Sequence, residues 1–164
     1  MRCAILPPLI VASLLMLASC ASAKLPPYSQ VRDETLAVLD AVAKSVPEAT
    51  EIARTPEFDP YPCNERLTFG TQSGAFFTGQ WTIYVDADFD VPDFVERVPQ
   101  ILGEGWEVDP LGIPLSFAQV RMIRESPHMS LTVEESVQGD RKAVELLAMS
   151  QCGVPPLGDD TPTN

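Results

Sequence analysis

The spacing of apolar residues predicts two amphipathic helices. The first covers residues 30–45, with Ser29 in the position of a helix cap and Pro47 at its end. The second follows Asp90, which is placed as its cap, and ends at Gly103. The apolar residues at spacings of three and four are Leu36, Leu39, Ala43 and Val46 in the first helix, and Phe94, Val95, Val98, Ile101 and Leu102 in the second.

Between the two helices the apolar period falls to two, which is the period of a strand. Phe77 to Val85 alternate in this way, and we expect them to form a hairpin with Leu67 and Phe69 across a bend at Ser73-Gly74. Residues 48–65 hold several prolines and no sustained period. They therefore predict an extended connection.

Strand patterns also follow the second helix. They occupy residues 106–108, 116–124, 129–133 and 143–149, with a turn at Gln138-Gly139-Asp140 before the last of them. Strands joined by tight turns pair antiparallel, and two amphipathic helices can cover one face of such a sheet. The sequence predicts an α+β fold, an antiparallel meander sheet of about five to six strands with two helices packed on one face.

The first residues have the layout of a signal peptide. Arg2 precedes an uncharged apolar run from Ala4 to Leu17, shorter than the roughly 20 residues that a membrane-spanning helix requires. The run ends in Leu17-Ala18-Ser19-Cys20, which resembles the lipobox of bacterial lipoproteins. The resemblance implies cleavage before Cys20 and a lipid on its sulfur, so that the bilayer is a partner through Cys20. The alternative is an ordinary secretory signal cut near residues 21–23.

Cleavage before Cys20 leaves 145 residues, which suffice for one domain. We expect a signal peptide over 1–19, a spacer over 20–28, a single domain over 29–154 and a disordered tail over 155–164. The net charge of the whole chain is −12, and loss of the basic residue of the signal peptide makes it −13. Such a charge repels nucleic acid and excludes it as a partner, while a charged partner should be cationic.

Two of the four cysteines, Cys63 and Cys152, remain once the signal peptide and the lipidated position are set aside. In an exported chain an even pair predicts one disulfide, here closing a loop of about 90 residues. The alternative is two reduced thiols. Two cysteines and one histidine make a poor zinc site, because structural zinc takes four such ligands.

The layout resembles a group of small actinobacterial lipoproteins of unknown role. The matching residues are Pro62-Cys63, Trp81, Gly105-Trp106 and Ser150-Gln151-Cys152. The resemblance covers most of the chain after Cys20. It implies an extracytoplasmic location and an α+β fold, and it does not imply any particular activity.

Asp86, Asp88 and Asp90 alternate like the first positions of a calcium-binding loop. The pattern then fails, because Val91 stands where glycine makes the turn and Arg97 where a bidentate glutamate belongs. We interpret the segment as a solvated connection with a capping aspartate. A weak surface cation site is the alternative.

Other residues that could take part in catalysis or ligand binding have simpler interpretations. His128 is the single histidine and lacks a nucleophile motif, so a turn position at a strand start is favoured over catalysis. Trp81 and Trp106 can stack on a flat ligand, but strand aromatics more often lie in the core. The acidic pairs Glu134-Glu135 and Asp159-Asp160 are interpreted as solvated charge.

The sequence thus predicts a lipid-anchored protein on the extracytoplasmic face of the cell membrane. Its expected role is that of a non-catalytic binding or accessory module for an unidentified envelope protein or ligand, without a cofactor. Two alternatives stay open, an envelope enzyme of unknown reaction and a structural component of an envelope complex. A polar pocket would favour the enzyme, and an exposed apolar patch would favour the binding protein.

Overall fold

The computed structural model describes residues 24–47, 49–63 and 74–155. The predicted signal peptide, Cys20, the Leu67 and Phe69 arm of the first hairpin, and the tail from residue 156, with Asp159-Asp160, lie outside the described residues. The helices are α1 (Tyr28–Lys44) and α2 (Val91–Leu102). The strands are β1 (Ala49–Arg54), β2 (Tyr61–Pro62), β3 (Ala75–Phe76), β4 (Thr78–Val85), β5 (Glu107–Val108), β6 (Gln119–Glu125), β7 (His128–Gln138) and β8 (Arg141–Ser150).

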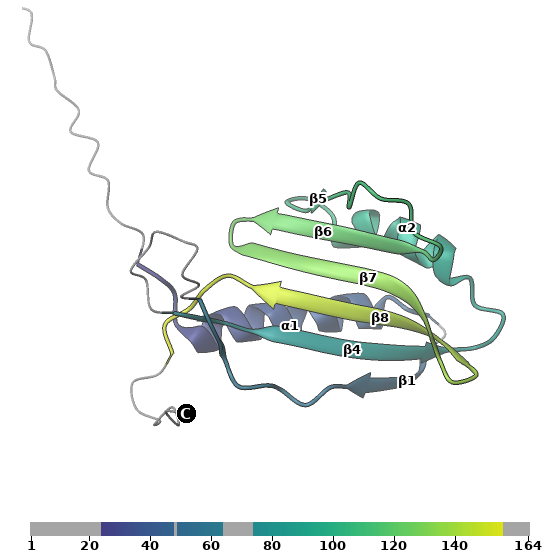
Figure 1. Cartoon of the computed structure of the whole chain (residues 1–164), viewed down its shortest axis with the longest axis horizontal. Coiled ribbons are helices and arrows are strands. Elements are labelled where there is room, and N and C mark those ends of the chain that lie inside the picture. The colour runs from purple at the N-terminus through teal and green to yellow at the C-terminus, as the bar shows by residue number, and fades with distance from the viewer. Residues whose placement is uncertain (1–23, 48, 64–73, 156–164) are drawn as a thin grey trace, which may run out of the picture.

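Six of these strands form one antiparallel sheet in the order β1-β4-β8-β7-β6-β5 (Figure 1). Strands β5 to β8 are the predicted meander, and β4 pairs with the other edge of β8. Gly139 makes the β7–β8 turn with a φ of 70°, a backbone conformation that favours glycine. Strands β2 and β3 form a separate two-stranded sheet. The predicted α+β fold is confirmed.

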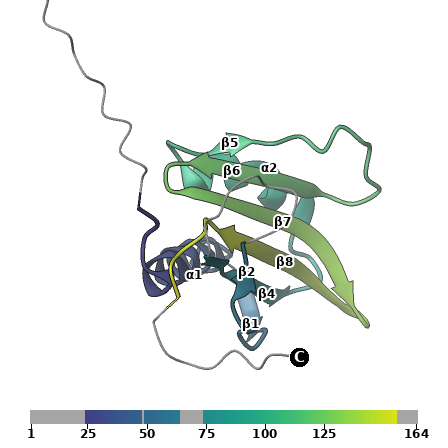
Figure 2. The same ribbon diagram turned by 60° about the vertical axis from the view of Figure 1, so that its left-hand side comes forward.

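Both helices cover the same face of the six-stranded sheet, as Figures 1 and 2 show from two directions. Helix α1 packs on β4 and β8, and α2 packs on β6 and β7. Their apolar stripes and the inward side chains of the strands form one core, which includes Leu39, Val42, Ile83, Phe94, Leu131 and Leu146. Burial of such side chains is the main force that holds the two layers together.

Helix α1 begins two residues earlier than its sequence pattern predicts. Ser29 was the expected cap, but it lies inside the helix, and Pro27 precedes the first turn without a side-chain cap. The reason is a long-range contact, because the Tyr28 N–H donates to the carbonyl of Val154 at 2.8 Å. The Val154 N–H in turn donates to the carbonyl of Pro26 at 2.8 Å. The end of the expected spacer is therefore bound to the domain.

Helix α2 has the predicted ends. A side-chain oxygen of Asp90 accepts a hydrogen bond from the N–H of Asp93 at 3.0 Å, which satisfies one of the free donors of the first turn. The helix continues through Pro99 to Leu102, and Gly103 ends it with a φ of 72°. This cap fixes the connection between β4 and α2.

Strand β1 is missing from the sequence prediction, which assigned residues 48–65 to a connection. Its residues are mostly exposed, and it pairs with one neighbour, β4. An edge strand with one half-buried isoleucine, Ile52, leaves no alternation to detect in the sequence. The strand ends at Arg54, before the run of prolines that begins at Pro56.

Candidate ligand-binding cleft

A cleft of about 680 Å³ opens where β1 stops pairing with β4. Strand β1 covers the edge of β4 only from Trp81 to Val85, and the chain then turns away through residues 55–61. The floor and sides are mainly apolar. They include Leu36, Phe58, Tyr61, Trp81, Leu147 and Met149.

The edge of β4 presents backbone polar groups to this cleft. The Ser150 N–H donates to the Phe77 carbonyl at 2.9 Å, so the backbone N–H and C=O of Phe77 point toward β8. Because these groups alternate along a strand, those of Thr78 and Gln80 point away from β8, toward the cleft. The Thr55 N–H donates to the carbonyl of Gln80 at 3.0 Å, which is the last bond from the β1 side. Strand β1 pairs with β4 only from Trp81 onward, so within the described ranges the N–H and C=O of Thr78 and the N–H of Gln80 have no partner strand on this edge.

An ion pair holds the outer wall of the cleft against α1. Two nitrogens of the Arg32 guanidinium donate to the two carboxylate oxygens of Glu57 at 2.7 and 2.5 Å. This hydrogen bonding lowers the pKa of Glu57 from its ordinary value of 4.5, against the opposing effect of burial. Both side chains are partly exposed, so the pair fixes the position of the wall more than it stabilises the fold.

Aromatic rings line the same wall. The rings of Tyr61 and Phe76, which face each other across the β2–β3 pair, stack with their centroids 5.4 Å apart. Phe58 lies against Tyr61 with a centroid distance of 6.4 Å. Phe58 is 56% exposed and Tyr61 is 41% exposed, so apolar area on this wall is open to a ligand.

Trp81 lies in the core, as predicted, and also forms part of the cleft floor. The Arg54 guanidinium lies 4.5 Å from the centroid of its ring. Such a contact is a cation–π interaction, and Arg54 also lines the cleft. Trp106 is half-buried at the margin of the core, with the guanidinium of Arg124 at 5.1 Å.

Gly79 lets α1 approach the strand that bears the cleft. A Cβ atom at this position would lie 2.5 Å from the Cδ1 of Leu39, closer than packed atoms allow. Leu39 is fully buried and fills the space that a side chain at position 79 would need. The small residue therefore sets the separation between α1 and the edge of β4.

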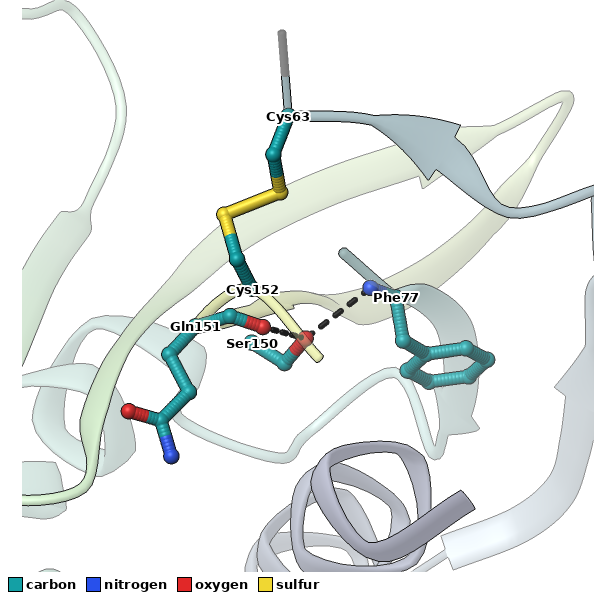
Figure 3. The surroundings of a disulfide bond; sticks show 5 residues. All are labelled: Cys63, Phe77, Ser150, Gln151 and Cys152. Atoms are coloured by element: carbon teal, nitrogen blue, oxygen red, sulfur yellow. Dashed lines mark hydrogen bonds between the residues drawn. A yellow bond between two sulfur atoms is a disulfide. The ribbon is translucent and has the colours of Figure 1, made fainter. Parts of the chain in front are cut away.

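The predicted disulfide is present between Cys63 and Cys152, with the two Cα atoms 6.2 Å apart (Figure 3). Cys63 follows β2, and its N–H donates to the carbonyl of Gly74 at 2.8 Å. Cys152 follows β8, and the next residue, Gly153, exchanges two backbone hydrogen bonds with Ala75, of 2.8 and 2.9 Å. The bond therefore joins the β2–β3 sheet to the end of β8. The expected strand at Leu67 lies outside the described residues.

Asp86, Asp88 and Asp90 are exposed on the connection between β4 and α2. In the part of the chain that the structure describes, they do not converge into a group that could hold a metal ion. Instead the ammonium of Lys142 donates to the carbonyls of Ala87 and Phe89 at 2.7 and 2.9 Å. A positive charge thus already lies on this connection, a contact that the sequence pattern did not reveal.

The remaining candidates lie apart from one another. His128 begins β7, as expected, and its exposed ring is 3.9 Å from the carboxylate of Glu125. The interpretation of Glu134-Glu135 as solvated charge was too simple, because both are half-buried. Glu134 accepts a hydrogen bond from the side chain of Gln119, and Glu135 accepts one from the N–H of Ala118.

No helix in the described ranges has the length and apolar character needed to cross a membrane. No family model matches the chain, and neither a curated protein nor a solved structure matches it.

Proposed function

We propose that this chain is a lipoprotein, anchored at Cys20 on the extracytoplasmic face of the cell membrane, that binds a partner at the edge of β4. The signal-peptide layout and the Leu17 to Cys20 motif support the anchor. The disulfide between Cys63 and Cys152 is consistent with export, because such bonds persist in oxidising compartments.

The ligand is an extended peptide segment of an envelope protein, which adds to the sheet as a strand. The observation that carries this proposal is the pair of backbone groups of Thr78 that face the cleft without a backbone partner among the described residues. An extended peptide satisfies such groups with its own N–H and C=O, whereas a compact ligand does not repeat their spacing.

The walls of the cleft suit the side chains of such a peptide. Successive side chains of an added strand point to opposite faces of the sheet. On one face they would meet Leu36 of α1 and Trp81, and on the other Leu147 and Met149 of β8. Leu147 and Met149 are 41% and 38% exposed, so binding would remove apolar area from water on both faces.

A random-peptide display library, selected on the purified protein, tests this binding. The peptides selected should bind Thr78→Val, which keeps the N–H, with nearly the wild-type affinity. They should bind Thr78→Pro about fivefold more weakly, because proline removes one donor and a net hydrogen bond contributes about 1 kcal/mol. Equal binding by the two variants, or a library without any binder, contradicts the proposal.

Hydrogen exchange gives a second test of peptide binding at this edge, and it needs no variant protein. The amides of Thr78 and Gln80 face the cleft, so a bound peptide should slow their exchange. The amide of Phe77 is already bonded to the Ser150 side chain and serves as the internal control. Slowing at Phe77 alone contradicts strand addition at this edge.

The anchor is tested by metabolic labelling with a fatty acid in a bacterial host that processes lipoproteins. Wild-type protein should take up the label, and Cys20→Ala should not, because the thiol accepts the lipid. Label that persists in the variant rules out attachment at Cys20.

A further inference from the structure

The connection between β5 and β6 exposes a row of large apolar side chains. Ile113 is 67% exposed, and Leu111, Leu115 and Phe117 are also exposed, as is Val108 on the preceding strand. Residues 110–117 contain no charged residue. We refer to residues 110–117 as the apolar loop. Contiguous exposed apolar side chains of this size mark a docking surface.

Both ends of the apolar loop are fixed to the sheet. At its start, the Asp109 N–H donates to the Arg121 carbonyl at 2.9 Å, and the Arg121 guanidinium lies 3.4 Å from the Asp109 carboxylate. At its end, the Glu135 N–H donates to the Ala118 carbonyl at 2.8 Å. Pro110 and Pro114 restrict the backbone between these points. The loop therefore presents its side chains outward from a rigid base.

We infer that the apolar loop inserts into the interfacial region of the bilayer that carries the anchor, as a second membrane contact. This inference rests on the proposed lipidation of Cys20. Three residues lie between that cysteine and Lys24, the first described residue, and the four residue-to-residue steps span at most about 14 Å. The anchor thus holds the domain close to the lipid surface.

The position of the loop fits simultaneous contact. In both Figure 1 and Figure 2 the connection between β5 and β6 lies along the upper edge of the molecule, and the described chain begins at its left-hand side. The β7–β8 turn lies at the lower right in both views. A bilayer along the upper edge therefore meets the loop and leaves the β7–β8 turn in water.

The chemistry of the loop favours lipid over a charged protein surface. Insertion of the loop itself desolvates no charge, and of the three charged residues that line the hollow beside it, Asp109 and Arg121 pair with each other at the base, while Glu96 is exposed on α2. The chain as a whole carries a net charge of −12, so attraction to anionic headgroups does not drive the contact. The contact should therefore form on zwitterionic lipid and persist at high salt.

An environment-sensitive dye measures this insertion. The lipidated protein is reconstituted in phosphatidylcholine vesicles with the dye on Ile113→Cys or, as the control, on Val137→Cys. These two positions have the same exposed fraction, 67%, and Val137 lies near the β7–β8 turn. The dye at position 113 should shift to shorter wavelength and be quenched by brominated lipid, and the dye at position 137 should do neither.

Flotation of the same vesicles separates this inference from the proposed function. Protein that does not float has no anchor, and the proposed function then fails first. Protein that floats while the dye at position 113 stays in water overturns the membrane contact alone. As a second variant, Ile113→Asp with Leu115→Asp should speed transfer of the protein between vesicles by about tenfold or more, and an unchanged rate would also overturn the inference.

Discussion

The Ser150 side chain completes the backbone pairing of Phe77 at the end of the sheet. Its hydroxyl oxygen accepts a hydrogen bond from the Phe77 N–H at 2.9 Å and its O–H donates to the Gln151 carbonyl at 2.7 Å (Figure 3). The Ser150 N–H also donates to the Phe77 carbonyl. Phe77 is thereby bonded on both polar groups toward β8, which directs the next residue, Thr78, into the cleft.

Replacement Ser150→Ala should lower the free energy of unfolding by about 1–3 kcal/mol, because it leaves the buried N–H of Phe77 without an acceptor. Urea unfolding measures this difference. Ser130→Ala is the control, since Ser130 is half-buried on β7 and has no side-chain hydrogen bond within the described ranges. A cost for Ser150→Ala no larger than that of the control would show that the hydroxyl does not support Phe77.

Loss of the disulfide should destabilise the whole domain. Cys152→Ser should cost roughly 2–5 kcal/mol or prevent folding, because the bond closes a loop between residues separated by 89 positions. Cys63→Ser should have the same effect, and the double variant should be no worse than either. Peptide mapping under non-reducing conditions checks the pairing directly, and two free thiols would refute it.

Gly79→Ala should cost about 1–3 kcal/mol, since the added methyl group would overlap the side chain of Leu39. A double-mutant cycle with Leu39→Ala isolates this contact. Each single change should destabilise the protein, but Gly79→Ala should cost much less in the Leu39→Ala background. Additive costs would mean that the glycine is required for another reason.

Calcium should leave the melting temperature of the protein nearly unchanged at millimolar concentration. The reason is that the ammonium of Lys142 already binds the carbonyls of Ala87 and Phe89 on the connection that bears Asp86, Asp88 and Asp90. Differential scanning calorimetry with calcium and with a chelator checks this expectation. A marked rise in the melting temperature with calcium would show that the three aspartates form a binding site.

The sequence predicts the elements whose signal is local. The helices and the inner strands have apolar stripes or alternation, and Asp90 stands directly before the helix that it caps. The start of α1 could not be predicted, because the acceptor for Tyr28 is Val154, far along the chain. A strand is recognised in a sequence by the alternation of buried apolar and exposed polar residues, and β1 has no fully buried residue.

The candidate cleft could not be predicted from the sequence either. It exists because β1 ends opposite Trp81 while β4 extends back to Thr78, which is a matter of strand register. Its outer wall depends on the pairing of Arg32 with Glu57, two residues that no local pattern connects. The disulfide was predictable because the chemistry of an exported chain leaves Cys63 and Cys152 as a pair.

Attachment through Cys20 underlies both the proposed peptide binding at the envelope and the membrane contact of the apolar loop. Mass spectrometry of the tryptic peptide at the amino terminus of the exported protein tests it most directly, because trypsin cuts after Lys24. We predict a peptide of residues 20–24 that carries a diacylglycerol on the cysteine sulfur. An unmodified peptide beginning at residues 21–23, or one that still contains the signal-peptide residues, would contradict the account.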